Sequence, residues 1–239
     1  MMTKSVSSIL LGVIVLGIVG TLGIVVAIRR SAGTFSVSWQ NNRRTITVGP
    51  KDSVQAALNA AQPGDTVVLQ AGAVFRGSLI LPVKSGTGEI VIQSSRLAEL
   101  SENARVKPSQ SGLFPKLQTT NPEPVLKTEP GAHHYRFVGI EFSPSDSSVK
   151  VYDLIRLGES RQEQKALDSV PHHLVFDRCY IHGFDKQDVQ RGISLNSSET
   201  TISNSYISEI HGVGYDTQAI AGWNGPGPFH IINNYLEGA

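Results

Sequence analysis

Four short segments in the second half of the chain align with one another without gaps. Each has an apolar residue at its first and sixth positions and a small or apolar residue at its fourth. The segments begin at Phe137, Phe176, Ile202 and Ile231. A second series, anchored at Ile155, Ile193 and Ile220, falls between them. The starts of the first series lie 39, 26 and 29 residues apart, and those of the second lie 38 and 27 apart. The two spacings lengthen and shorten together. This indicates that each repeat is one coil of the chain, with a loop of variable length inserted at one corner of the coil.

A run of about six residues cannot bury an apolar face alone, but equivalent runs stacked in parallel about 4.8 Å apart form a continuous interior. The pattern therefore predicts an all-β solenoid with vertical columns of equivalent side chains. A β-sandwich also uses short strands, but tight hairpin signals of the Asn-Gly or Asp-Gly type are absent between the repeats, since Asn224-Gly225 lies in a proline- and glycine-rich loop. The first-position and sixth-position columns should point inward, and the fifth-position column should point outward. The outward column is Tyr180, Tyr206 and Tyr235.

The first half predicts a short helix followed by more strands. Asp52 is a suitable N-cap, and Gln55 stands three residues later, as in a capping box. One face of the helix would carry Val54, Ala57, Leu58 and Ala61. Short β-branched runs follow at 66–69, 78–81 and 89–93. The polar, proline-punctuated stretch over about 94–130 predicts a long excursion loop within the same domain.

Residues 9–28 contain no charged side chain, and at 1.5 Å per residue a helix of that length spans about 30 Å. We therefore expect residues 1–30 to be a membrane anchor or signal segment, with one transmembrane helix, and residues 31–45 to be a linker. The alternative is a cleaved signal peptide, whose apolar region is usually shorter. Residues 46–239 would form the solenoid domain. We expect an extracytoplasmic domain, although Arg29 and Arg30 favour the opposite orientation.

Composition excludes several classes of function. The 239 residues carry a formal net charge of only +1, which gives no reason to expect a nucleic-acid partner. One cysteine, Cys179, excludes an internal disulfide framework and a cysteine-rich zinc site. We expect no cofactor and no metal. Cys179 is predicted to be an inert core residue, because its segment position points inward.

The repeats and the residues around the predicted helix resemble the right-handed parallel β-helix family, also called pectin lyase-like. The resemblance rests on residues 53–69, which are similar to the capping helix and first strand of such proteins, and on the asparagine-rich repeats. It covers the chain from about residue 45 onward. It implies a right-handed parallel β-helix with a short N-terminal capping helix. Such folds commonly have more coils, so the resemblance also implies that the domain is incomplete at its C-terminus.

The resemblance implies a protein that binds or cleaves a polysaccharide, either as a lyase or as a glycoside hydrolase. Lyases need a base and a cation near the substrate carboxylate, and hydrolases need paired carboxylates. Neither signature can be matched residue by residue to this chain, so enzymatic activity stays uncertain and no catalytic residue is assigned. The alternative is a non-catalytic surface scaffold or a carbohydrate-binding module.

The best candidate site lies in the corner loops before two successive coils. Asp188 and Arg191 precede one coil, and Asp216 stands at the equivalent place before the next. Trp223 offers an aromatic face that suits a sugar ring. These four residues are therefore the predicted substrate-binding residues. The alternative is that the charged residues pair across coils and that Trp223 covers the core at a turn.

Histidines recur at equivalent places in the repeat. The pairs 133–134 and 172–173 each precede a segment, and His182 and His211 each precede a glycine. The repetition favours stacked structural positions. A metal site at His182 and His211 would need further ligands that the sequence does not offer.

Overall fold

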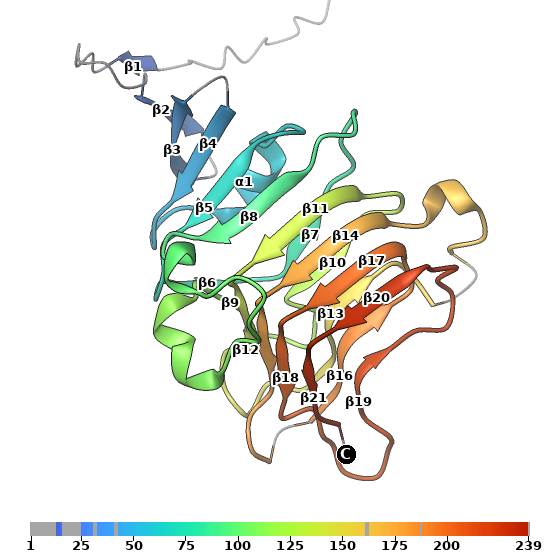
Figure 1. The fold of residues 1–239 in the computed structure, drawn as a ribbon. Coiled ribbons are helices and arrows are strands. Elements are labelled where there is room, and N and C mark those ends of the chain that lie inside the picture. Colours follow the sequence, from blue (N-terminus) through green and yellow to red (C-terminus); the bar gives the residue numbers. More distant parts are fainter. Residues whose placement is uncertain are drawn as a thin grey trace, which may run out of the picture.

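The computed structural model describes residues 13–15, 25–30, 33–40, 43–160, 163–186 and 188–238. The chain winds so that each successive coil adds one strand to each of three sheets (Figure 1). Within the described residues, sheet A has ten strands in the following order. They are β1 (Val13–Val15), β2 (Val25–Arg30), β3 (Gly33–Gln40), β4 (Arg43–Val48), β5 (Thr66–Leu69), β8 (Ile90–Ser94), β11 (His133–Val138), β14 (His172–Asp177), β17 (Ser198–Ser203) and β20 (Phe229–Ile232).

The other two sheets contain parallel strands throughout the described residues. Sheet B consists of β6 (Val74–Arg76), β9 (Lys116–Thr119), β12 (Glu141–Pro144), β15 (Tyr180–His182), β18 (Tyr206–Ser208) and β21 (Tyr235–Leu236). Sheet C consists of β7 (Leu79–Leu81), β10 (Leu126–Thr128), β13 (Val151–Leu157), β16 (Val189–Leu195) and β19 (Gln218–Ala221). In sheet A the pairing is antiparallel from β1 to β4 and parallel from β4 onward.

The predicted columns lie in register. Phe137 pairs with Phe176, Phe176 with Ile202, and Ile202 with Ile231. The rings of Phe137 and Phe176 stack with centroids 5.2 Å apart, and both side chains are buried. The sixth-position column of sheet B and the Ile155 column of sheet C are in register in the same way. Parallel stacking gives the short apolar runs a shared interior. Burial of apolar side chains there stabilises the coils, which no single run could achieve alone.

The bends between sheets A and B are held by polar side chains. Cys179 is buried, and its backbone N–H donates to Ser205 Oγ at 3.0 Å. The Ser205 N–H in turn donates to Asn234 Oδ1 at 2.8 Å. The burial of Cys179 confirms the predicted core position, and it raises the pKa of the Cys179 thiol to about 12, which favours the unreactive thiol over the thiolate. Outside the bend, Tyr206 stacks on Tyr235 at 4.2 Å, as the outward column predicts.

The helix α1 (Val54–Ala60) buries the predicted face against sheets A and C. Its N-cap differs from the prediction. Ser53, not Asp52, caps the helix, with Oγ accepting the Ala56 N–H at 3.1 Å. Asp52 Oδ2 instead accepts the Gly49 N–H at 2.8 Å in the preceding turn. The side chain of Gln55 bonds to the backbone of Ile80 in β7 rather than closing a capping box.

The predicted transmembrane helix over residues 9–28 is wrong. The described residues of this span are strands, β1 and part of β2, and β2 pairs antiparallel with β3. Within the part of the chain that the structure describes, no helix combines the length and the apolar character that a membrane crossing needs. The run is rich in valine and isoleucine, which favour strands when a partner strand is present. Positions 9–12 and 16–24 lie outside the described residues.

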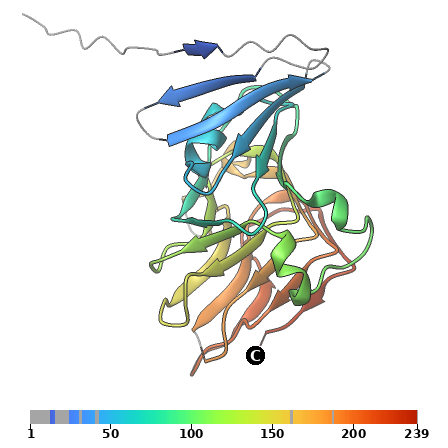
Figure 2. The same ribbon diagram turned by 90° about the vertical axis from the view of Figure 1, so that its left-hand side faces the viewer.

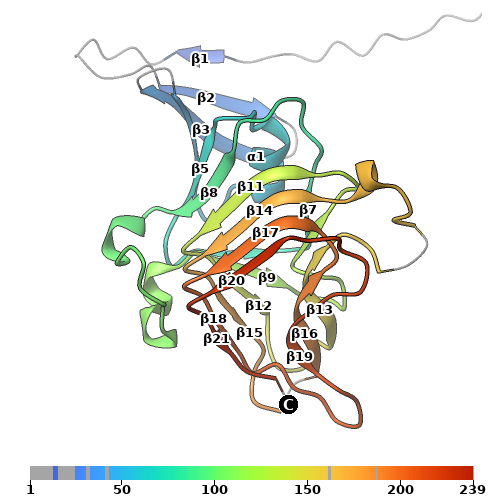
Figure 3. The same ribbon diagram turned by 45° about the vertical axis from the view of Figure 1, so that its right-hand side comes forward.

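The membrane contact expected through residues 9–28 is therefore not supported, and the extracytoplasmic location stays a prediction. Residues 33–40, expected to be part of a linker, form β3, in which Phe35 and Val37 are buried in the main core. The division of the chain into an anchor, a linker and a domain otherwise stays a prediction. Figures 2 and 3 show the N-terminal strands at one end of the stacked coils and the C-terminus at the other.

The stretch over 94–130 contains more structure than the predicted loop. It includes two short 3-10 helices, Leu97–Glu99 and Pro108–Leu113, and then the strands β9 and β10. Its first part protrudes beside the coils (Figure 2) and forms a small apolar cluster of Leu100, Val106 and Phe114. Tyr180 and Tyr206 pack against that cluster. The excursion therefore covers part of the outer face of sheet B.

Candidate functional site

Three ionic side chains meet where β13 and β16 lie side by side. Asp153 of β13 pairs in register with Arg191 of β16. Asp153 Oδ1 lies 3.4 Å from Arg191 Nη1, and its Oδ2 accepts from Arg156 Nε at 3.0 Å. The Asp153 carboxylate and the Arg191 guanidinium are both almost completely buried. One carboxylate therefore serves two guanidinium groups, and the three side chains together carry one net positive charge.

The Arg191 guanidinium lies over two aromatic rings. Its Cζ lies 4.4 Å from the centroid of the Tyr152 ring and 4.0 Å from that of Trp223. Both rings are more than half exposed, at 53% and 55%. Arg191 Nε is a buried donor with no acceptor among the described residues. The two cation–π contacts hold the guanidinium in place, and Nε stays a donor without an acceptor.

Hydrogen bonds from a buried asparagine position the loop that carries Trp223. Asn196 directly follows β16, and its Oδ1 accepts from the N–H groups of Trp223 at 2.8 Å and Asn224 at 3.0 Å. A Cβ at Gly222 would overlap the carbonyl oxygen of Leu195, so only glycine lets this loop lie so close to β16. Gln164 Nε2 donates hydrogen bonds to the backbone oxygens of Asn196 and Asn224, so the loop that carries Gln164 is connected to both of these residues.

Three hollows follow one another along this face. The first, of about 470 Å³, is lined by Lys150, Val151, Tyr152, Asp188, Gln190 and Tyr215. The second, of about 560 Å³, shares Tyr152 and has Asp153, Arg156, Arg191 and Asn196 among its walls. The third, of about 310 Å³, is lined by the loop of Trp223 and by residues from 164 to 170. We call the three hollows together the outer groove.

Asp188 lies in the first hollow as one half of an ion pair. Its Oδ2 is 2.7 Å from Lys150 Nζ. The hydrogen bond from Lys150 lowers the pKa of the Asp188 carboxyl. Partial burial raises the pKa of the Tyr215 hydroxyl on the same wall. This end of the groove therefore presents a charge pair and a neutral phenol.

The structure brings together three of the four residues predicted from the sequence. Asp188, Arg191 and Trp223 line the outer groove. Asp216 is not among its lining residues. Its side chain is exposed. Its backbone oxygen accepts a hydrogen bond from Gln190 Nε2 at 3.3 Å. Asp216 precedes β19 by two residues, so its side chain falls in the turn rather than on the strand face.

Sequence reasoning missed Tyr152, Asp153, Arg156 and Asn196. A signal for Asp153 was present in the repeat spacing. Ile155 and Ile193 are aligned 38 residues apart, and the same offset places Asp153 opposite Arg191. The repeat spacing gives no comparable signal for Tyr152, because its contact with Arg191 depends on the side-chain conformations of both residues. Asn196 looks like an ordinary loop asparagine until its hydrogen bonds are seen.

A second polar cluster lies on sheet B. Glu141 accepts from Lys116 Nζ at 2.8 Å and from Ser111 Oγ at 2.6 Å, and His182 Nε2 lies 3.4 Å from it. Burial by itself would raise the pKa of Glu141, but the bonds from His182, Lys116 and Ser111 outweigh it and lower the pKa. None of the described hollows is lined by these residues. We interpret the cluster as a structural network that joins the excursion to sheet B.

A third cluster consists of imidazoles at the start of β11 and β14. His134, His172 and His173 have ligand nitrogens that all lie within 4.8 Å of one another. Burial lowers the pKa of His134 and of His172, and the neighbouring histidines add to the effect. His182 and His211 do not meet in this way. His182 bonds to Gly183 and Glu141, and His211 Nε2 lies 3.1 Å from Glu209.

Comparison with known proteins gives few matches. No protein-family model matches the sequence, and no curated protein matches it. Among solved structures, the chain is similar to an alginate lyase from Paenibacillus sp. str. FPU-7, with 20% identity and a TM-score of 0.47. The similarity covers 69% of this chain and 44% of that one, so the chain spans less than half the length of that lyase. A similarity of this level assigns neither a substrate nor a reaction, and membership of the pectin lyase-like family stays a prediction.

Proposed function

We propose that the outer groove binds a polysaccharide chain. The observation that carries the proposal is the contact of the Arg191 guanidinium with the rings of two exposed residues, Tyr152 and Trp223. Aromatic faces suit the apolar C–H faces of sugar rings, and a guanidinium supplies donors in a fixed planar arrangement for hydroxyl or carboxylate oxygens. Both kinds of group are in direct contact at this site.

The shape of the groove supports a chain-like ligand rather than a small compact one. The hollows are open, and the first two succeed one another along the direction of β13 and β16, with Tyr152 in both linings. A small-molecule site is usually one enclosed cavity with a dominant apolar lining.

The charges along the groove support binding by stacking and hydrogen bonds rather than by a net field. The lining contains four cationic and four anionic side chains. They are Lys150, Arg156, Lys165 and Arg191, and Asp153, Glu159, Glu163 and Asp188. Both uronic-acid and neutral polymers are therefore suitable probes. A preference for the uronic-acid polymer would come from the net positive Asp153, Arg156 and Arg191 group.

The test uses the two tryptophans of the chain as a matched pair. Trp39 lies on β3, is half exposed and is not among the lining residues, whereas Trp223 is in the groove. In a Trp39→Phe background, fluorescence reports on Trp223 alone. We expect soluble alginate or a neutral glucan to change this fluorescence in a saturable way. Trp223→Ala and Tyr152→Ala should each weaken binding about tenfold, which corresponds to about 1.4 kcal/mol. Isothermal titration calorimetry measures the affinity of these variants and of Trp39→Ala, because Trp223→Ala removes the fluorescent reporter.

The outcome that would contradict the proposal is equal binding by Trp223→Ala and Trp39→Ala, or no saturable signal with either polymer. The same samples are assayed for new reducing ends and for unsaturated sugar products. Products that appear with the unchanged chain and disappear with Trp223→Ala would assign cleavage in the groove. Saturable binding without product would assign a carbohydrate-binding module. Absence of binding favours the scaffold alternative.

A further inference from the structure

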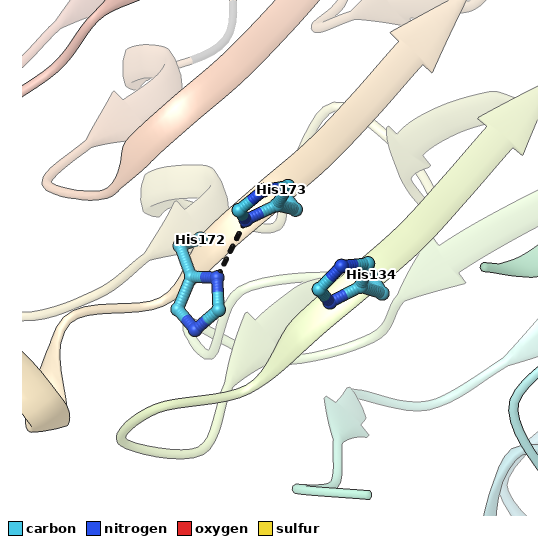
Figure 4. A group of neighbouring side chains, drawn as sticks. All are labelled: His134, His172 and His173. Carbon is cyan, nitrogen blue, oxygen red and sulfur yellow. Dashed lines mark hydrogen bonds between the residues drawn. The ribbon is translucent and has the colours of Figure 1, made fainter. Parts of the chain in front are cut away.

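Four histidines form two stacked pairs at the corner that leads into sheet A. His133 of β11 and His172 of β14 are in register, and their rings stack at 4.9 Å with 13° between their planes. His134 and His173 stack at 4.4 Å with 9° between their planes. The second pair has left-handed backbone conformation, with φ of 58° and 52°. Because the backbone conformation repeats from coil to coil, both side chains leave the chain in the same direction (Figure 4).

Their nitrogens converge. The Nδ1 atoms of His172 and His173 lie 2.7 Å apart, and a nitrogen of His134 completes a group whose members are within 4.8 Å of one another. A tetrahedral Zn²⁺ site needs nitrogens about 2.0–2.1 Å from the ion. Because the rings of His134 and His173 lie nearly parallel, with their lone pairs in the ring planes, binding one ion requires one of the two rings to rotate out of the stack. The rings are half-buried or exposed, so an ion can reach them from solvent.

Glu199 orients one of these ligands. It stands at the next coil, again with left-handed backbone, and its Oε2 lies 2.5 Å from His173 Nε2. A neutral imidazole that donates its Nε2–H to a carboxylate has an unprotonated Nδ1, whose lone pair can bind a metal ion. A carboxylate that fixes the tautomer of a histidine is the usual outer partner of a metal-binding imidazole. The Nδ1 atom released in this way is the one that faces His172.

We propose that His134, His172 and His173 bind one divalent transition-metal ion of the Zn²⁺ type, with Glu199 orienting His173. An all-imidazole set selects Zn²⁺, Cu²⁺, Ni²⁺ or Co²⁺ over Ca²⁺ and Mg²⁺, which take oxygen ligands. Three protein nitrogens leave a fourth position for water or for His133. The ion would link two successive coils. The site is separate from the outer groove, with which it shares no lining residue.

The experiment titrates Co²⁺ and Zn²⁺ into the full chain, without an affinity tag and after treatment with a chelator. We expect one equivalent of Co²⁺ to give a visible absorption band, which one equivalent of Zn²⁺ abolishes and Ca²⁺ leaves unchanged. His134→Asn and His173→Asn should each weaken Zn²⁺ binding at least tenfold. Asparagine accepts left-handed backbone, so these variants preserve the turn. Glu199→Gln should weaken binding about tenfold, as expected for an outer partner.

The matched control is His211→Asn. His211 also lies beside a carboxylate, at 3.1 Å from Glu209, but is not part of the converging group. Its substitution should leave Zn²⁺ affinity unchanged. The proposal is overturned if no stoichiometric Zn²⁺ binding occurs, or if His134→Asn and His173→Asn bind as tightly as the unchanged chain. Equal loss in His211→Asn would also overturn it. Circular dichroism of each variant confirms that the coils are folded.

Discussion

At the scale of single residues, the site depends on a buried carboxylate shared by two cations. Asp153 is 4% exposed at its side chain, and Arg191 is 10% exposed. Burying a charge is costly unless it is paired and hydrogen-bonded, so neither residue would be stable here alone. Arg191 also holds its position through the rings of Tyr152 and Trp223. A substitution at Asp153 therefore acts on both folding and the groove.

We expect Asp153→Asn to destabilise the chain by about 3 kcal/mol, because it leaves the buried Arg191 cation without its counter-charge. The measurement is urea unfolding followed by circular dichroism. The control is Asp185→Asn, at an exposed position, which should change the free energy of unfolding by less than about 0.5 kcal/mol. Similar midpoints for the two variants would contradict this account of the Asp153 pair.

At the scale of elements, neighbouring strands are joined by side chains in register. In sheet B, Glu141 of β12 pairs in register with Lys116 of β9 on one side and with Tyr180 of β15 on the other. In sheet A, the column of Phe137 and Phe176 fills the interior between coils. The Lys116–Glu141 contact is ionic and depends on pH, whereas the Phe137–Phe176 contact is apolar and does not. The two contacts can therefore be tested separately.

The Glu141 cluster should make stability depend on acidity. Its folded pKa is lowered from the ordinary value of 4.5. A carboxyl with a lowered folded pKa contributes stability above its unfolded pKa and loses it as pH falls through the folded pKa. Thermal unfolding of the unchanged chain should therefore shift to lower temperature below about pH 4.5, the unfolded value. Glu141→Gln should unfold at a lower temperature at pH 7 and show a smaller further decrease in acid. Parallel curves for the two chains would exclude this role.

Phe176→Ala should cost about 3–5 kcal/mol, because it opens a cavity in a column whose neighbours cannot collapse onto it. The comparison is Phe229→Ala in β20, where the ring is 37% exposed. That variant should cost at most about 1 kcal/mol. Chemical unfolding of both variants provides the measurement. An equal cost at the two positions would mean that the interior column does not dominate the stability of the coils.

At the scale of the whole molecule, opposite charges are nearly balanced both in the sequence and in the groove. The formal net charge is +1, and the groove lining contains equal numbers of cationic and anionic side chains. Long-range attraction of a charged polymer needs a surplus of one sign. The affinity of this chain for a polysaccharide should therefore come from local contacts.

We accordingly expect polysaccharide affinity to change less than about threefold between low and moderate salt, since screening acts on net fields and exposed charges. Fluorescence titrations of the Trp39→Phe chain at several salt concentrations measure this. A protein that neutralises many backbone charges loses orders of magnitude in affinity over the same range. A steep salt dependence here would point to a binding surface other than the outer groove.

The sequence by itself determined the repeat, the vertical register and the interior columns, because the spacing of apolar residues is a local property that stacking must respect. The same alignment placed Asp188, Arg191 and Asp216 together before two successive coils, and the first two line the outer groove. The prediction for residues 9–28 was wrong, since a long β-branched run suits a helix or a strand and only the pairing of β2 with β3 decided between them.

Only the tertiary structure showed the contacts made by side chains from different coils. The contacts of Arg191 with Tyr152 and Trp223 and the convergence of three histidines depend on side-chain directions at corners. Those directions follow from backbone turns, such as the left-handed residues His134 and His173, which the apolar pattern does not encode. Periodicity therefore fixes which coils are neighbours, whereas the corner conformations decide which polar groups meet.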